Sequence, residues 1–399
     1  MPWACSRVHA CAPAADVFRV IIVLTVGSAT IGTTINHERV AMARAIDLAR
    51  HRQGRTHPNP PVGALVITPG GCCVATGSTQ TAGDAHAEAV ALVEAGTRAR
   101  GATLVVTLEP CNHAGRTPPC TETIVRAGIN RIVIGSRDMN PAVRGGGIEY
   151  LRQHGVEVVL ETIQAAVDLA QGHHKLCQTG RPFVTAKWAM TLDGRVNVPA
   201  GGGRVTGSAA RRHVHELRDS VDAVITGAGS IRVDDSRLTV RPPPEDGRQP
   251  IRVVFDSLAR TNPGARIFQS EADTLVLTTQ AAPLSRVHTL EQAGATVIEC
   301  PSEETNRICV DSALAVLGNR GLTTVLLEAG PTLTRAFLDA DAVDQSAVFV
   351  AAWTMGSGQL APISVSELQK NGSSGQVMHL VGPDLLFLSD ERRYGPGAA

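Results

Sequence analysis

Short apolar runs alternate with helical patterns along most of the chain, and this alternation most constrains the fold. In the first part of the sequence, apolar runs at residues 64–67, 103–108 and 131–136 lie between helical patterns such as those at residues 37–53 and 121–128. Short runs without polar alternation are typical of strands buried on both faces. The pattern therefore predicts an α/β domain whose sheet is covered by helices.

A second alternation begins after Gly180-Arg181-Pro182, and its strand-like runs lie at residues 183–190, 221–227, 251–257, 274–279, 295–300, 323–330 and 346–353. A length of 399 residues accommodates two or three domains. We predict an α/β domain over residues 37–160, a linker over 161–180 and a second α/β domain over 181–392. Residues 1–36 are expected to be an extension, disordered or upstream of the true start of translation, and residues 393–399 a disordered tail.

The composition favours small-molecule partners. Thirty-seven Lys and Arg residues balance 37 Asp and Glu residues, and aromatic residues make up only 3% of the chain. Nucleic-acid binders usually show a basic excess or aromatic residues that stack on bases. We therefore expect this chain to bind neither double-stranded nor single-stranded nucleic acid.

The apolar run at residues 17–26 is too short to span a membrane. Nine irregularly spaced cysteines argue against a disulfide framework and for a cytoplasmic enzyme. The formation of a homo-oligomer is compatible with the sequence.

The cysteines at positions 111 and 120 belong to a metal-binding pattern. His86-Ala87-Glu88 begins a predicted helix, and Pro110-Cys111 follows a predicted strand, with Cys120 further along. One imidazole and two thiolates suit a tetrahedral zinc ion and leave its fourth position to water, whose pKa then falls to about 7. Glu88 remains free to move protons. H-x-E followed by P-C and a second cysteine is the pattern of zinc-dependent deaminases.

Less specific interpretations exist for each of these residues. Taken singly, His86 could cap or pack, Glu88 could be solvated, and two cysteines could be buried without any ligand. A closed structural zinc site is a further alternative, and His113 is the candidate for its fourth ligand. The combination of the four residues favours the open, catalytic site.

Three longer stretches of the sequence show which family of zinc-dependent deaminases the first half of the chain resembles. THPNPPVGALV, LEPCNHAGRTPPC and DMNPAVRGGG together resemble the deaminase half of the bifunctional deaminase/reductase of riboflavin biosynthesis. The resemblance implies a cytidine-deaminase-like three-layer fold, zinc ligation by His86, Cys111 and Cys120, and Glu88 as the proton donor. It places five further residues near the substrate, namely Asn59, His113, Arg116, Asp138 and Asn140. Thr79 stands where the family usually carries a histidine.

The second half resembles the reductase half of the same family, whose fold is similar to that of dihydrofolate reductase. The strings that carry this resemblance are AKWAMTLDGR, ARRHVHELRDSVDAVITGAGSIRVDDSRLTVR and EAGPTL. The resemblance implies an NADPH site made by Ala189, Ser230, Asp234, Ser257, Gly330, Pro331, Thr332 and Leu333. It implies substrate contacts by Arg218, Leu238, Arg241 and Glu328. The guanidinium groups of Arg218 and Arg241 suit a ribose phosphate.

Three stretches of the second half depart from the family pattern. Arg204 replaces an expected tryptophan, Asp235-Ser236 replaces Asp-Pro, and AAWTMGSG at residues 351–358 replaces a conventional A-P-x-L-L-G run. The expected function is zinc-dependent deamination of 2,5-diamino-6-(5-phosphoribosylamino)pyrimidin-4-one followed by NADPH-dependent reduction of its ribosyl group to ribityl. The alternatives are a deaminase with an inactive reductase domain, a nucleic-acid base deaminase and a non-catalytic zinc-stabilised binding protein.

Overall fold

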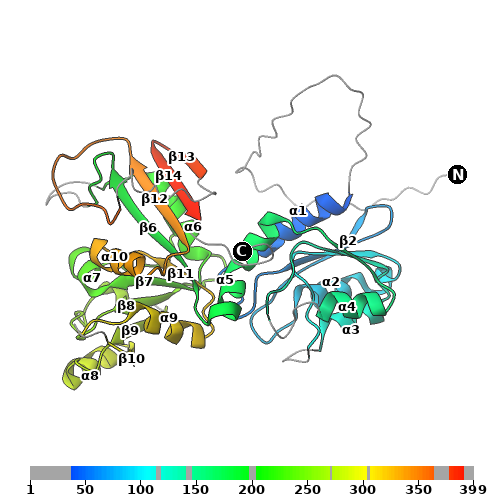
Figure 1. Ribbon diagram of the computed structural model, residues 1–399, viewed down its shortest axis with the longest axis horizontal. Helices are drawn as coiled ribbons and strands as arrows, with labels where there is room; N and C mark the ends of the chain where they lie inside the picture. Colours follow the sequence, from blue (N-terminus) through cyan, green and yellow to red (C-terminus); the bar gives the residue numbers. More distant parts are fainter. Residues whose placement is uncertain are drawn as a thin grey trace. The chain divides into compact units, whose positions relative to one another are not determined.

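Figure 1 shows the computed structural model, which describes residues 37–113, 118–140, 146–196, 204–269, 272–302, 306–363 and 377–390. The expectations for the extension at residues 1–36 and the tail at residues 393–399 lie outside the described residues. The described residues form two β-sheets, one after the other in the sequence, and helices lie between the strands of each. The predicted fold class is thereby confirmed.

The first sheet has five strands among the described residues, in the order β2-β1-β3-β4-β5. Its strands are β1 (Gly63–Ile67), β2 (Cys73–Ser78), β3 (Thr103–Val106), β4 (Arg131–Ile134) and β5 (Glu157–Leu160). Strand β1 pairs antiparallel with β2 and β3, whereas β3, β4 and β5 are parallel. Parallel strands need covering helices on both faces, and the sequence between the strands supplies them.

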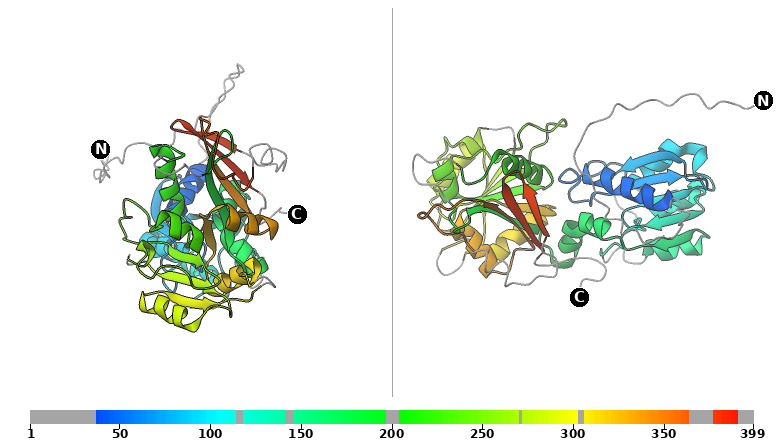
Figure 2. Two further views of the ribbon diagram at one scale, coloured as in Figure 1. Left: turned by 90° about the vertical axis from the view of Figure 1, so that its left-hand side faces the viewer. Right: turned by 90° about the horizontal axis from the view of Figure 1, so that it is seen from above.

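Helices cover this sheet on both faces and make the predicted three layers (Figure 2). The helices are α1 (His37–Arg50), α2 (Ala87–Ala95), α3 (Cys120–Ala127), α4 (Gly146–Gln153) and α5 (Gln164–Thr179), with a 3₁₀ turn at Gly96–Ala99. Alternate strand residues enter different cores, as period 2 requires. Leu104 packs with the residues of α2, α3 and α4, and Val105 packs with those of α1 and α5.

The second sheet has nine strands among the described residues, in the order β10-β9-β8-β7-β11-β6-β12-β14-β13. Its strands are β6 (Phe183–Thr191), β7 (Ala223–Gly227), β8 (Ile251–Phe255), β9 (Thr274–Thr278), β10 (Thr296–Glu299), β11 (Thr324–Leu327), β12 (Gln345–Ala351), β13 (Val377–Val381) and β14 (Asp384–Asp390). The neighbouring strands from β10 to β12 in this order are parallel, whereas β14 pairs antiparallel with β12 and with β13.

Helices also cover both faces of the second sheet. They are α6 (Ser208–Asp219), α7 (Ala228–Asp234), α8 (Leu284–Gln292), α9 (Val310–Asn319) and α10 (Pro331–Asp339), with a 3₁₀ turn at Arg266–Phe268. In β7, Ile225 packs on the face that holds Leu314 and Phe337, whereas Val224 packs on the opposite face with Ile231 and Leu290. The buried apolar runs of the sequence are therefore the central strands.

The stretch predicted to be a linker, residues 161–180, contains helix α5. Ala166 and Leu169 of this helix are buried against the first sheet. The sequence of this stretch is partly helical in pattern, and the polar residues on the buried face, including His174 and Lys175, interrupt that pattern. The expected domain boundaries at residues 160 and 181 stay predictions, with α5 lying between them.

No described helix combines the length and the apolar character that crossing a membrane requires.

Helix α5 is held by a buried ion pair. Lys175 on α5 contacts Asp344, which precedes β12, and both side chains are at most 6% exposed. Asp344 also accepts the backbone N–H of Val184 in β6 at 2.7 Å. One carboxylate thus contacts a buried cation and accepts a backbone N–H, and removing its charge takes this carboxylate away from a buried lysine.

We predict that Asp344→Asn lowers the free energy of unfolding by about 3–5 kcal/mol, because the buried lysine loses its counter-ion. Urea unfolding followed by tryptophan fluorescence measures this, since Trp188 and Trp353 both lie in the second α/β region. The control is Asp339→Asn, which removes the exposed pair with Arg335 and is expected to cost at most about 1 kcal/mol. Equal effects of the two substitutions would contradict the role assigned to the buried pair.

Candidate active sites

His86, Cys111 and Cys120 come together and are called here the His-Cys-Cys group. His86 is the N-cap residue of α2, Cys111 lies in the loop after β3, and Cys120 is the first residue of α3. The Nδ1 atom of His86 is 3.6 Å from Sγ of Cys111 and 3.3 Å from Sγ of Cys120. All three ligand atoms lie within 4.8 Å of one another.

This donor set fits zinc. Zinc bonds of about 2.1 Å to nitrogen and about 2.3 Å to sulfur, at a tetrahedral angle, place the nitrogen and sulfur atoms about 3.6 Å apart. The observed spacings are close to that value. His113, the candidate fourth ligand of a closed site, is not a member of the group among the described residues. The arrangement therefore offers three ligands, as an open site requires.

The environment favours the thiolate form of Cys111. Hydrogen bonding from Cys120, and next from His86, outweighs burial and lowers the pKa of Cys111 to about 4. The backbone N–H of Cys120, at the start of α3, donates to Sγ of Cys111 at 3.4 Å. A hydrogen bond to Cys111 in turn raises the pKa of His86. A thiolate that exists at neutral pH is ready to bind a metal ion.

Glu88 lies in the first turn of α2 and is only 4% exposed. Burial is the main reason that its pKa is raised to about 7, and the negative charge of Cys111 acts in the same direction. A carboxyl group with that pKa can both accept and release a proton near neutral pH. The residue predicted to move protons is therefore held in an environment suited to that task.

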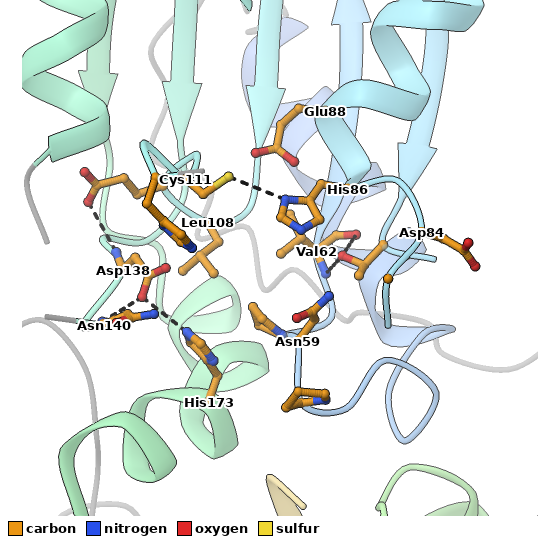
Figure 3. Close-up of a pocket in the computed structure, with 16 residues that line it drawn as sticks. Asn59, Val62, Asp84, His86, Glu88, Leu108, Cys111, Asp138, Asn140 and His173 are labelled. Atoms are coloured by element: carbon orange, nitrogen blue, oxygen red, sulfur yellow. Dashed lines mark hydrogen bonds and ion pairs between the residues drawn. The ribbon is translucent and has the colours of Figure 1, made fainter. Parts of the chain in front are cut away.

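His86 and Cys111 of the His-Cys-Cys group border a cavity of about 320 Å³ together with Glu88 (Figure 3). Four of the residues that the resemblance placed near the substrate line the same cavity, namely Asn59, His113, Asp138 and Asn140. Arg116 lies outside the described residues. Thr79, at the position of a family histidine, also lines the cavity, and its hydroxyl accepts the backbone N–H of Val62 at 3.0 Å.

Several cavity residues were not predicted from the sequence, among them Glu109 and His173. Glu109 accepts the backbone N–H groups of Asp138 and Ile148 at 3.3 and 3.2 Å. His173, on α5, lies 3.3 Å from Asp138. The position of Glu109 beside Pro110-Cys111 was an available signal, whereas His173 lies in the stretch interpreted as a linker.

In the second sheet, the predicted substrate residues Arg218 and Glu328 contact each other. Arg218 on α6 donates from two nitrogens to the two carboxylate oxygens of Glu328, at 2.5 and 3.1 Å. A third nitrogen donates to the carbonyl of Thr239 at 2.9 Å. Burial opposes ionisation of Glu328, but Arg218 and Lys187 outweigh it and lower its pKa. Lys187, which was not predicted, lies 3.9 Å from the carboxylate.

Arg241 lies among other guanidinium groups. Burial, and then repulsion from Arg218, Arg204, Arg237 and Arg266, lowers its pKa. Such a gathering of positive charge suits phosphate groups. Leu238, the remaining predicted substrate residue, is 5% exposed and adopts a positive φ of 55°. Its buried side chain packs in the core of the second sheet.

Three predicted NADPH-binding positions follow the carboxyl ends of neighbouring parallel strands, the edge at which open α/β sheets bind ligands. Ser230 follows β7, Ser257 follows β8, and Gly330 follows β11. The backbone N–H of Gly330 donates to Oγ of Ser230 at 3.1 Å. Pro331, Thr332 and Leu333 form the first turn of α10, Asp234 ends α7, and Ala189 lies within β6. The first amides of α10 can receive a phosphate.

Comparisons with known proteins agree with this arrangement. The family model of the cytidine and deoxycytidylate deaminase zinc-binding region matches residues 35–136, and that of the RibD C-terminal domain matches residues 182–380. The riboflavin biosynthesis protein RibD of Escherichia coli is 36% identical over 86% of this chain and 96% of its own length. RibD of Mycobacterium tuberculosis is 37% identical over 87% of this chain and 95% of its own length.

Solved structures of RibD proteins are similar to this chain over most of its length. RibD of Acinetobacter baumannii (form 1) superposes with a TM-score of 0.76 and 31% identity, covering 89% of this chain and 98% of the other. A diaminohydroxyphosphoribosylaminopyrimidine deaminase/5-amino-6-(5-phosphoribosylamino)uracil reductase from Thermotoga maritima has the same TM-score, 33% identity and the same coverage. The chain belongs to the RibD family of riboflavin-biosynthesis enzymes, with a zinc-binding deaminase domain followed by a reductase domain.

Proposed function

We propose that this chain catalyses two successive reactions on one small molecule. The first is hydrolytic deamination of 2,5-diamino-6-(5-phosphoribosylamino)pyrimidin-4-one, and the second is reduction of the ribosyl group of the product to ribityl by NADPH. The observation that carries the proposal is the buried carboxyl of Glu88, which shares one cavity with His86 and Cys111 of the His-Cys-Cys group. The names of the related proteins support the choice of substrate.

In the first reaction, His86, Cys111 and Cys120 would hold zinc. A zinc ion with three protein ligands supplies a nucleophile at neutral pH by acidifying water. Glu88 would accept a proton from the attacking water and deliver it to the amino group that leaves the ring as ammonia. Its raised pKa, about 7, matches both halves of this task. Overall, a carbonyl oxygen replaces the amino group on the ring, one water is consumed and one ammonia is released.

The other cavity residues would bind and orient the pyrimidine. Asn59 and Asn140 can each accept and donate hydrogen bonds, and Asp138 accepts them. These groups complement the amino, ring N–H and carbonyl groups of an aminopyrimidine. His113 lines the cavity as well, and we assign it a contact with the substrate rather than with the metal.

In the second reaction, NADPH would lie across Ala189, Ser230, Asp234, Ser257 and the Gly330–Leu333 turn. NADPH supplies the hydride that reduces C1 of the sugar. Arg218, Leu238, Arg241 and Glu328 would position the substrate, with the guanidinium groups directed to its phosphate. Lys187 is a further charged group close to Glu328. The departures at Arg204, Ser236 and residues 351–358 are the reason that an inactive reductase domain remains the alternative.

The enzyme is proposed to act in the cytoplasm, where thiols such as Cys111 and Cys120 stay reduced. Absence of nucleic-acid binding stays a prediction, and a homo-oligomer is compatible with the sequence. The small-molecule substrate is the partner that the family assignment supports.

We predict that the purified protein contains about one zinc ion per chain and that Cys120→Ala contains almost none. Metal analysis by mass spectrometry measures the zinc, and ammonia release measures the accompanying loss of deamination. Cys309→Ala is the matched control, because this free cysteine lies before α9 and outside the group. Retention of zinc in Cys120→Ala would contradict the proposed ligand set.

We predict that Glu88→Gln keeps its zinc and lowers kcat for ammonia release by roughly a hundredfold to ten-thousandfold, because the amide cannot accept or deliver the proton. The assay follows ammonia from the pyrimidine without NADPH. Glu149→Gln, an exposed position on α4, should behave as the wild type. Normal ammonia release by Glu88→Gln would exclude Glu88 as the proton carrier and favour a non-catalytic role for the group.

We predict that adding NADPH after deamination causes loss of nicotinamide absorbance, and that Glu328→Gln reduces kcat/KM for this step roughly tenfold to a hundredfold. The substitution leaves Arg218 and Lys187 without their carboxylate partner. Ammonia release should be unchanged and serves as the internal control for folding. Ammonia release by the wild type without any NADPH oxidation would support the alternative of an inactive reductase domain.

A further inference from the structure

A charged pair closes the part of the deaminase cavity that faces α5. The Nε2 atom of His173 lies 3.3 Å from Oδ1 of Asp138, and their side chains are 11% and 8% exposed. Both residues line the cavity that is also lined by Glu88, His86 and Cys111. Figure 3 shows His173 directed from its helix toward Asp138. The pair belongs to the wall against which a bound ring would rest.

Asp138 is fixed by a second contact. Its Oδ1 atom also accepts the backbone N–H of Asn140 at 2.8 Å, while its own backbone N–H donates to Glu109 at 3.3 Å. The imidazole of His173 and the backbone N–H of Asn140 therefore both contact Oδ1 of Asp138. This leaves Oδ2 as the carboxylate oxygen that can accept a hydrogen bond from a bound molecule.

The electrostatic surroundings make a counter-ion necessary. Four carboxyl groups line the cavity, at Asp84, Glu88, Glu109 and Asp138, and its described lining includes no lysine or arginine. A carboxyl that is buried beside other carboxyls tends to take up a proton. The ion pair reverses that tendency for Asp138, whose pKa is lowered by His173 in spite of burial. Burial likewise opposes protonation of His173, but Asp138 outweighs it and raises the pKa of the imidazole to about 10.

We infer that His173 is a positioning residue of the deaminase, which holds Asp138 as an oriented carboxylate so that Oδ2 can accept an N–H of the aminopyrimidine. This inference rests on the proposed function. A carboxylate forms a stronger hydrogen bond with an N–H donor than a neutral carboxyl oxygen does. His173 acts through Asp138 and takes no part in proton transfer to the leaving group. Its loss should therefore weaken substrate binding much more than turnover.

The test measures KM and kcat for ammonia release in two variants of the full-length, zinc-loaded enzyme. His173→Leu removes both the charge and the donor, and it is expected to raise KM roughly tenfold to a hundredfold with less than a threefold change in kcat. His173→Gln keeps an N–H donor and should recover part of this loss. Zinc content and NADPH oxidation should stay at their wild-type values.

Cys177→Ala is the matched control for packing. Cys177 lies one helical turn from His173, with Sγ 3.7 Å from Nε2 of that ring, but it does not line the cavity. Its replacement disturbs the surroundings of His173 without removing the ion pair, so KM should change less than twofold. A rise in KM equal to that of His173→Leu would assign the effect to packing and overturn the inference.

A double-mutant cycle with Asp138→Asn separates positioning from an independent contact. If His173 acts through Asp138, then adding His173→Gln to Asp138→Asn should raise KM by less than twofold further. Additive effects, or an unchanged KM in both His173 variants, would overturn the inference and leave the deaminase assignment intact. Failure of the wild-type enzyme to release ammonia from the pyrimidine would instead contradict the proposed function, and the inference with it.

Discussion

Parallel strand pairing decides where the chemistry of this chain can lie, because the carboxyl ends of parallel neighbours open at one edge of a sheet. In the first sheet, β3 and β4 run parallel, and the segments that follow them carry Cys111 and Asp138. In the second sheet, β7 and β11 run parallel and are followed by Ser230 and Glu328. Helices that bury the strands hold these segments in place, so the covered cores fix the sites.

Two buried carboxyl groups of the deaminase cavity, those of Glu88 and Asp138, differ in how readily they take up a proton. Burial next to the thiolate of Cys111 raises the pKa of Glu88 to about 7. Contact with His173 lowers the pKa of Asp138, although Asp138 is buried as well. Groups of the same chemistry whose pKa values are pushed apart are suited to different tasks. Here one carboxyl can exchange a proton near neutral pH while the other remains a charged acceptor.

The layers and the His-Cys-Cys group could be predicted because both leave local patterns in the sequence. Apolar runs marked the central strands, and the short spacing of His86 and Glu88 marked the start of a helix. Strands β2, β13 and β14 were not predicted. The residues of β13 are largely exposed, and those of β2 are mostly small or polar and form no continuous apolar run. The pair of Asp138 and His173 leaves no local pattern at all, since only the packing of α5 brings the two residues together.

Arg204 is a departure from the family pattern that changes the charge around Arg241. The resemblance led us to expect tryptophan at this position, a side chain that offers a ring for stacking. The guanidinium of Arg204 instead adds to the positive charge around Arg241, whose pKa it helps to lower. Both ligands proposed for this domain carry phosphate groups. An attraction between charges acts over a longer range than stacking and depends on ionic strength, so the exchange favours capture of anionic ligands over a fixed ring contact.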